Sequence, residues 1–354
     1  MKTGYPNSAK GAGILDLNPH QNRQACHDDH ELAYTLQGAM TTNTCSTSTK
    51  NMTMPPNARL LSSLVGLMSI VCIAMTSLPR ATFAQTDSTL IRVHALELEA
   101  TTGALPVHYS SGKKIQATEL SALLAKAAAY LATSLRVSTE INVALLSRDD
   151  WPAVWPFPYG LPYASLNAPW VVVMPATPEE SVLYPGFVGL LNEIDARTMI
   201  SNIGFHEIGH VYTSEYLYPP DIDGPPLRWL DELLAQYLAY AVMQALDTQR
   251  AAIWDTFTTA MLNLPSPKYT TLEAFEAEYN GFLATPEGAQ NYGWYQSLFA
   301  AKAGELFKTH GIALFSDLKT KLDWSNVSNW STATAITNLE SVAPGFQAWH
   351  DAMN

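Results

Sequence analysis

Cysteine is absent from most of this chain of 354 residues. The three cysteines, Cys26, Cys45 and Cys72, all lie within the first 84 residues. Residues 85–354 therefore offer no disulfide, no cysteine metal site and no thiol nucleophile.

Basic residues are also scarce. The chain carries 20 Lys and Arg against 32 Asp and Glu, which gives a formal net charge of −12. Because binding to phosphates needs clustered lysine and arginine, we expect no nucleic-acid partner. There is no internal repeat and no long block of like charge. With 47% hydrophobic residues, the chain can bury one sizeable core, or a core with a helical subdomain.

The N-terminal region does not have the pattern of a folded domain. Residues 1–59 are mixed and polar, and we interpret them as a disordered or mis-assigned extension. Leu60–Leu78 is apolar apart from a few serines and threonines, and small residues follow it up to Ala84. A short apolar run before such residues is typical of a signal peptide, here residues 60–84.

Two other readings of this region stay open. Met52 or Met54 is a candidate true start, which would give a signal peptide of ordinary length. Leu60–Leu78 is also just long enough to span a bilayer, and Arg59 fits a cytoplasmic flank. A membrane contact is therefore expected only if this segment is not cleaved. Either way residues 85–354 are exported, to a periplasm or the extracellular space.

The remaining sequence predicts an α+β fold. Residues 85–185 indicate a mixed-sheet subdomain with one helix, and residues 186–354 a mainly helical subdomain. The predicted strands are Leu90–Glu99, Leu105–Tyr109, Glu140–Leu146 and Pro169–Pro175. The predicted helices are Thr118–Leu135 and segments near 190–216, 228–247, 250–263, 271–280 and 291–309. Thr118 is expected to cap its helix, and the prolines that bound the last strand place it at a sheet edge.

One short motif carries chemistry. His206-Glu207-Ile208-Gly209-His210 is an HExxH sequence within a predicted helix. Residues four apart lie on one helix face, so both histidines can bind one zinc ion. Glu207 can then reach a water molecule without occupying a coordination position. The alternative is a helix with two incidental histidines, which makes a third ligand the deciding question.

The third ligand is absent from the residues directly after the motif. No HxxGxxH extension follows His210, which excludes the metzincin pattern. Instead, Asp231 and Glu232 occur in a helix that is otherwise apolar. Burying an unpaired carboxylate is costly, and a zinc ion would account for one of the two. The competing explanation is a solvated first turn, where acidic residues favour the helix dipole.

HEIGH followed by WLDELLAQY resembles the gluzincin peptidases of the broad peptidase MA-like group. Their pattern Trp-Leu-x-Glu-Gly-x-Ala matches Trp229, Leu230, Glu232 and Ala235, while Leu233 replaces the usual glycine. The resemblance implies a zincin-like fold with zinc held by His206, His210 and Glu232. By the same match, Asp231 is not a ligand.

A second similarity lies in Asn291–Gly311, which resembles the helix that follows the active site in these families. There a tyrosine near the helix start hydrogen-bonds to the oxyanion of the reaction. Tyr295 aligns best, and Tyr292 is the competitor. A tyrosine used only for packing remains an equal alternative.

These features predict an exported zinc peptidase that acts on peptides or proteins with Glu207 as general base. The Gly-x-Met-x-Asn motif of aminopeptidases in this clan is absent, which favours an endopeptidase. Two alternatives remain: a non-catalytic binding domain with a zincin fold, and a membrane-anchored processing peptidase.

Overall fold

The computed structural model describes residues 89–354 except 221, 223, 266, 283–284 and 354. The predictions for residues 1–59 and 60–84 lie outside these residues. The described residues belong to one compact unit.

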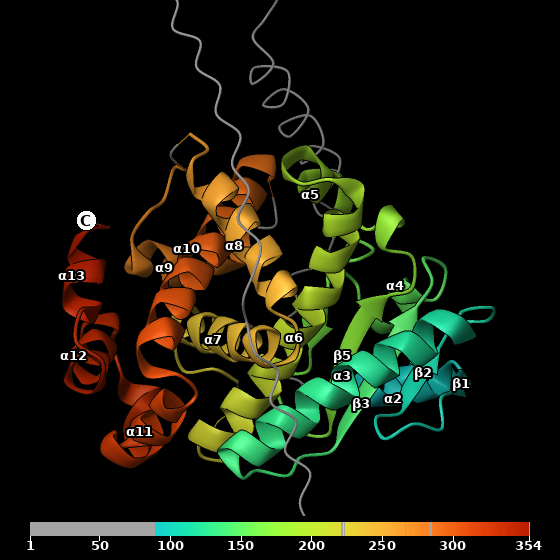
Figure 1. The fold of residues 1–354 in the computed structure, drawn as a ribbon, viewed down its shortest axis with the longest axis horizontal. Coiled ribbons are helices and arrows are strands. Elements are labelled where there is room, and N and C mark those ends of the chain that lie inside the picture. Colours follow the sequence, from blue (N-terminus) through green and yellow to red (C-terminus); the bar gives the residue numbers. More distant parts are fainter. Residues whose placement is uncertain (1–88, 221, 223, 266, 283–284, 354) are drawn as a thin grey trace, which may run out of the picture. The chain divides into compact units, whose positions relative to one another are not determined.

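The order of elements confirms a mixed α+β fold with a small sheet (Figure 1). The strands are β1 (Glu99–Ala100), β2 (Val107–Tyr109), β3 (Ile141–Leu146), β4 (Tyr163–Ala164) and β5 (Trp170–Pro175). The helices are α2 (Thr89–Ala95), α3 (Lys114–Leu135), α4 (Trp151–Val154), α5 (Tyr184–Leu190), α6 (Glu193–Leu217), α7 (Arg228–Leu246), α8 (Thr248–Leu262), α9 (Leu272–Phe282), α10 (Pro286–His310), α11 (Ala313–Lys321), α12 (Thr332–Val342) and α13 (Phe346–Asp351), with 3-10 turns η1 (Pro178–Glu180) and η2 (Trp324–Asn329).

The sheet is mixed, with strand order β1-β2-β3-β5-β4. Strands β2, β3 and β5 are parallel, and the short outer strands β1 and β4 are antiparallel to their neighbours. Helix α3 makes the crossover between β2 and β3. The parallel strands are covered on both faces, as parallel sheets usually are.

Alternate residues of the central strands face two different hydrophobic clusters. Val143 and Val172 belong to the large core that also contains residues of α3 and α6. Ala144 and Val173 point the other way, into a smaller cluster with Trp151. Because both faces of β5 are buried, its sequence is an almost continuous apolar run.

The predicted strand Leu90–Glu99 is wrong over most of its length, since its first part forms α2. Val93 is 1% exposed and packs in the smaller cluster. Leu90 and Leu96 pack against the same cluster, three residues to either side, which is helical spacing. Arg92 also donates from Nε to the backbone oxygen of Val154 at 2.9 Å. These contacts outweigh the partial alternation of the sequence.

Two further details of the prediction were wrong. Helix α3 begins at Lys114, and Thr118 does not cap it but donates to the Lys114 carbonyl at 2.8 Å. Strand β5 is not an edge strand, because β4 pairs along its outer side. The prolines, Pro169 and Pro175, lie before and at the end of β5, where they leave its central hydrogen bonds intact.

Helix α6 packs tightly on both sides because of two glycines. A Cβ at Gly204 would lie 3.2 Å from a methyl carbon of Leu124 in α3. A Cβ at Gly209 would lie 2.6 Å from the backbone oxygen of Ala235 in α7. The backbones of α6 and α7 therefore meet at a point where only glycine fits on α6.

The predicted subdomain boundary at residues 185/186 is not a structural break. Helix α5 spans it, and one hydrophobic core extends from Leu105 in the sheet part to Phe346 near the end of the chain. The sequence changes from sheet to helices at this point, but the two parts share their interior.

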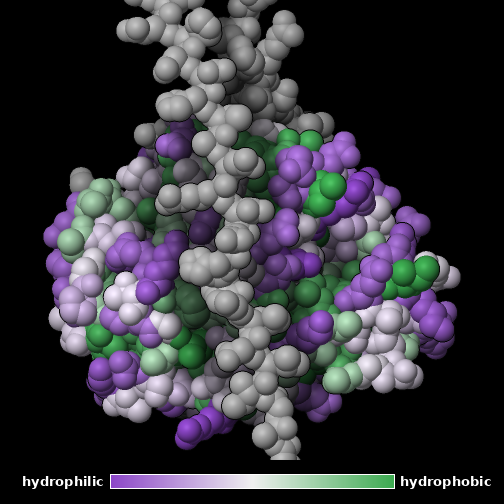
Figure 2. Space-filling view, viewed as in Figure 1, coloured by the Kyte–Doolittle hydropathy of each residue, from purple (hydrophilic) through white to green (hydrophobic). Residues whose placement is uncertain are grey.

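On the face seen in Figure 2, hydrophilic and hydrophobic residues are interspersed. The large exposed apolar side chains of the described chain lie on five different helices: Ile91, Ile115, Val188, Ile194 and Leu246. Within the residues described, no helix combines the length and apolar character needed to cross a membrane.

Candidate metal and active site

Helix α6 carries the HExxH motif in its buried second half. Asn192 caps this helix, because its side chain accepts from the backbone N–H of Asp195 at 3.0 Å. His206 and Glu207 are 6% and 7% exposed. The rings of His206 and His210 stand edge to face with their Nε2 atoms 3.0 Å apart, so both histidines present the same nitrogen to one point.

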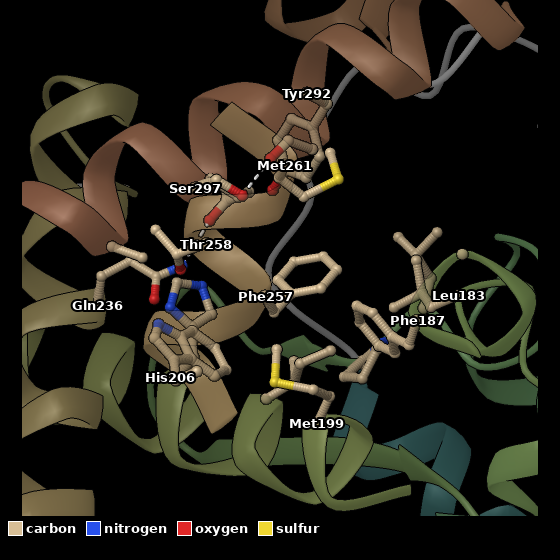
Figure 3. A pocket seen from close by; sticks show the side chains of 18 of the residues that line it. Leu183, Phe187, Met199, His206, Gln236, Phe257, Thr258, Met261, Tyr292 and Ser297 are labelled. Atoms are coloured by element: carbon tan, nitrogen blue, oxygen red, sulfur yellow. Dashed lines mark hydrogen bonds between the residues drawn. The ribbon is translucent and has the colours of Figure 1, made fainter. Parts of the chain in front are cut away.

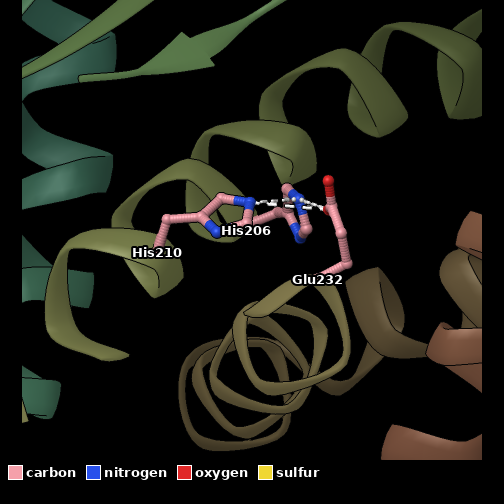
Figure 4. Close-up of side chains that lie close together, drawn as sticks. All are labelled: His206, His210 and Glu232. Carbon is pink, nitrogen blue, oxygen red and sulfur yellow. Dashed lines mark hydrogen bonds and ion pairs between the residues drawn. The ribbon is translucent and has the colours of Figure 1, made fainter. Parts of the chain in front are cut away.

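Helix α7 brings a carboxylate to the same point, as Figure 4 shows. Oε2 of Glu232 lies 3.1 Å from Nε2 of His206 and 3.5 Å from Nε2 of His210. Glu232 is 4% exposed, and its Oε2 has no hydrogen-bond donor within the described chain. The structure therefore joins the three side chains that the sequence predicted as ligands.

The spacing of these atoms fits a zinc ion. Ligands of a tetrahedral zinc at about 2.0–2.1 Å stand about 3.3 Å from one another. The three separations here are 3.0, 3.1 and 3.5 Å. Among the described residues, these three are the group of His, Cys, Asp and Glu side chains arranged closely enough to hold a metal.

The charges of the site also fit a cation. Glu207, Asp231 and Glu232 are all at least 90% buried, and no described lysine or arginine forms an ion pair with them. Burial would raise the pKa of Glu232, but the two histidines outweigh it and hold that pKa well below its usual value. Three buried carboxylates next to two histidines leave a negative excess that a divalent cation would neutralise.

Asp231 has a role that the sequence did not reveal. Its Oδ2 lies 2.7 Å from Nδ1 of His210, and its Oδ1 accepts from the hydroxyl of Tyr218 at 3.2 Å. Burial alone would lower the pKa of His210, but the Asp231 carboxylate outweighs it and raises that pKa well above its usual value. When a metal replaces the proton on Nε2, the Asp231 carboxylate would keep the remaining proton on Nδ1, so that the Nε2 lone pair of His210 is directed at the metal, as in carboxylate–histidine–metal arrangements.

Glu207 lies between the helices and the sheet. Burial raises the pKa of its carboxyl, while His206, His210 and the backbone amide of Ala164 act in the opposite direction. Ala164 belongs to β4, the outermost strand on this side of the sheet. The carboxylate of the motif is therefore adjacent to a sheet edge.

The two candidate tyrosines of α10 face different surroundings. The prediction that Tyr295 faces the site is wrong: its hydroxyl donates to the backbone oxygen of Thr271 at 2.6 Å, and its ring is fully buried beside Phe275 and Phe299. Tyr292, three residues earlier, donates to Oε1 of Glu232 at 3.1 Å.

Tyr279 of α9, which the sequence gave no reason to select, donates to the same Glu232 oxygen at 3.2 Å. Burial, followed by the charge of Glu232, raises the pKa of both Tyr279 and Tyr292 far above the ordinary value. Both hydroxyls therefore remain protonated and act as donors at neutral pH.

A cavity of about 210 Å³ opens beside the motif. His206, Glu207 and Tyr292 line it together with large apolar side chains: Leu183, Phe187, Met199, Ile203, Trp254, Phe257 and Met261. In Figure 3, His206 and Gln236 lie on one side of the cavity, and Leu183 and Phe187 lie on the opposite side. Gln236 donates to Gln296 at 2.8 Å, one helical turn beyond the Tyr292–Glu232 hydrogen bond.

Comparison with known proteins gives no relative for this chain. No protein-family model, no curated protein and no solved structure matches it. The function must therefore be argued from the site itself.

Proposed function

We propose that this protein is a zinc-dependent peptidase of the gluzincin type, with His206, His210 and Glu232 as metal ligands. The observation that carries the proposal is the convergence of three ligand atoms at zinc spacing, buried beside the carboxylate of Glu207. Zinc bound there would polarise the scissile carbonyl and lower the pKa of a water molecule.

Two side chains of the protein would then have separate roles: one transfers protons, and the other stabilises the developing negative charge. Glu207 takes a proton from the attacking water on its carboxylate and passes it to the leaving amine. Its raised pKa favours this exchange. Tyr292 lines the cavity, and its hydroxyl, which donates to Glu232, could instead donate a hydrogen bond to the oxygen that becomes negatively charged.

The cavity supports a preference among peptide substrates. It begins at His206 and Glu207, and most of the other residues that line it are apolar, with Gln236, Thr258 and Ser297 among the polar ones. A bulky aromatic or aliphatic side chain next to the scissile bond would displace water from this space and fix the register of the peptide. We therefore propose an endopeptidase that cleaves beside such a residue. Export remains a prediction, because the segment that would direct it lies outside the described residues.

The test is digestion of a mixed peptide library, with products identified by mass spectrometry, by the wild-type protein and by Glu207→Gln. We expect cleavage beside bulky apolar residues, and a loss of about 10²–10⁴-fold in the variant because the general base is removed. Cleavage that survives Glu207→Gln would contradict the mechanism. A zinc-loaded wild type that cleaves no peptide would favour the non-catalytic binding domain.

A further inference from the structure

The two carboxylate oxygens of Glu232 have opposite surroundings. Oε1 accepts two hydrogen bonds, from Tyr279 at 3.2 Å and from Tyr292 at 3.1 Å. Oε2 accepts none and faces the two histidine Nε2 atoms. One oxygen is thus held by hydroxyls while the other is left for the metal position.

The two tyrosines that hold Oε1 differ in what else they can reach. Tyr292 lines the cavity, whereas Tyr279 is not among the cavity-lining residues. The Tyr279 ring packs edge to face against Phe275 at 5.3 Å, and the Arg228 guanidinium lies over it at 4.5 Å from the ring centre. Tyr279 is therefore fixed behind Glu232, and Tyr292 stands between Glu232 and the substrate space.

We propose that Tyr279 is a positioning residue for the metal ligand, holding Oε1 of Glu232 so that Oε2 stays directed at the two histidines while Tyr292 serves the substrate. This inference rests on the proposed zinc site. It assigns to a residue of α9, outside both motif helices, a part in metal binding.

The hydrogen bonds explain why two hydroxyls are needed. If Tyr292 turns toward a substrate oxygen, Glu232 loses one of its two donors at the moment when charge develops. A buried carboxylate oxygen without any donor is destabilised, and a carboxylate free to rotate no longer presents Oε2 alone. Tyr279 keeps one hydrogen bond in place throughout.

The experiment compares Tyr279→Phe, Tyr292→Phe and Tyr295→Phe in the full chain. Zinc affinity is measured by competition with a chromophoric chelator, and kcat is measured at saturating zinc. Tyr295→Phe is the matched control, because it also removes a buried hydroxyl with one hydrogen bond, but away from Glu232. The zinc-dependent rise in Tm within each variant separates metal binding from any general loss of stability.

We expect Tyr279→Phe and Tyr292→Phe each to weaken zinc binding about 10–100-fold, which is typical for groups that orient a ligand, and Tyr295→Phe to leave it unchanged. At saturating zinc, Tyr279→Phe should keep a kcat well above that of Tyr292→Phe, which should stay about 10²–10³-fold low, as expected on loss of an oxyanion donor.

The outcomes are separable. A wild type that binds no zinc would overturn the proposed function itself. A wild type that binds zinc, with Tyr279→Phe binding equally well or losing no more than Tyr295→Phe, would overturn the positioning role alone. A kcat of Tyr279→Phe at saturating zinc as low as that of Tyr292→Phe would also contradict the division of roles.

Discussion

The sheet region and the interface between α6 and α7 bury polar groups in opposite ways. Around the sheet, five buried hydroxyl side chains each have a hydrogen-bond partner: Thr89, Ser110, Ser121, Ser165 and Ser181. Between α6 and α7, histidine and carboxylate groups lie close together, and within the described chain Nδ1 of His206 and Oε2 of Glu232 have no hydrogen-bond partner.

This difference separates buried polar groups that stabilise the fold from buried polar groups that serve the proposed metal site. A buried hydroxyl with a partner contributes about 1 kcal/mol to stability, whereas removing a carboxylate from water without a compensating cation costs several kcal/mol. The buried hydroxyls around the sheet therefore need no cation. The proposed zinc ion would supply the cation that the interface lacks, so the stability of the interface should depend on zinc.

Removing the third proposed ligand should have the largest effect on the zinc-dependent stability. In the wild type, free zinc at 100 times its Kd would add about 2.7 kcal/mol to the free energy of unfolding. Glu232→Gln should lose that increment, because the neutral amide is a poor zinc ligand, and the metal-free protein should also be less stable, because the two histidines lose the carboxylate that they stabilise. Thermal unfolding with zinc and with a chelator measures both. An equal zinc-dependent rise in Tm for variant and wild type would exclude Glu232 as a ligand.

Separating the two helices should have the next largest effect. In Gly209→Ala, the added Cβ would meet the Ala235 oxygen at 2.6 Å, so α6 and α7 must move apart. Overpacking of this kind costs about 1–3 kcal/mol, and zinc affinity should fall because the ligands lie on both helices. Urea unfolding and zinc titration test this.

The matched control is Gly186→Ala on α5, where nothing lies within 4 Å of the added Cβ. Alanine should stabilise that helix by about 0.5–1 kcal/mol. If both variants behave alike, the close approach of α6 and α7 is not what requires glycine at position 209.

Removing the carboxylate that orients His210 should have a smaller effect, and it should be seen in the zinc affinity. The two oxygens of Asp231 contact Nδ1 of His210 and the Tyr218 hydroxyl separately. In Asp231→Asn one of these oxygens becomes an NH₂ group, which cannot accept a hydrogen bond. We expect zinc affinity to fall about 10–100-fold, with the fold retained. Isothermal titration at neutral pH measures the change. Unchanged affinity would mean that His210 needs no carboxylate to fix its proton.

The sequence predicted those parts of the site that depend on local spacing. His206, Glu207 and His210 follow from positions along one helix, and Glu232 follows from a short pattern on the next. Tyr279 could not be predicted, because its contact with Glu232 joins residues 47 apart and no periodicity marks it.

The errors have similar causes. Tyr292 and Tyr295 are three residues apart on one helix, and only the packing of α9 decides that Tyr295 bonds to Thr271 and Tyr292 to Glu232. The strand β5 was assigned to an edge because prolines bound it, and β4, only two residues long, leaves almost no pattern in the sequence that would indicate a further strand. Packing and strand pairing, rather than the local pattern of the sequence, decide both cases.

The smallest expected effect tests the sheet side of the comparison. Ser121 of α3 donates to the backbone oxygen of Leu105 at 2.6 Å and is 5% exposed. Ser121→Ala leaves that carbonyl without this donor, which should cost about 0.5–1.5 kcal/mol in the free energy of unfolding. Because the hydroxyl lies outside the metal position, zinc affinity and the zinc-dependent rise in Tm should not change. If they fall together with stability, the sheet also sets the spacing of the ligands through α3 and α6, and the two regions cannot be treated as independent.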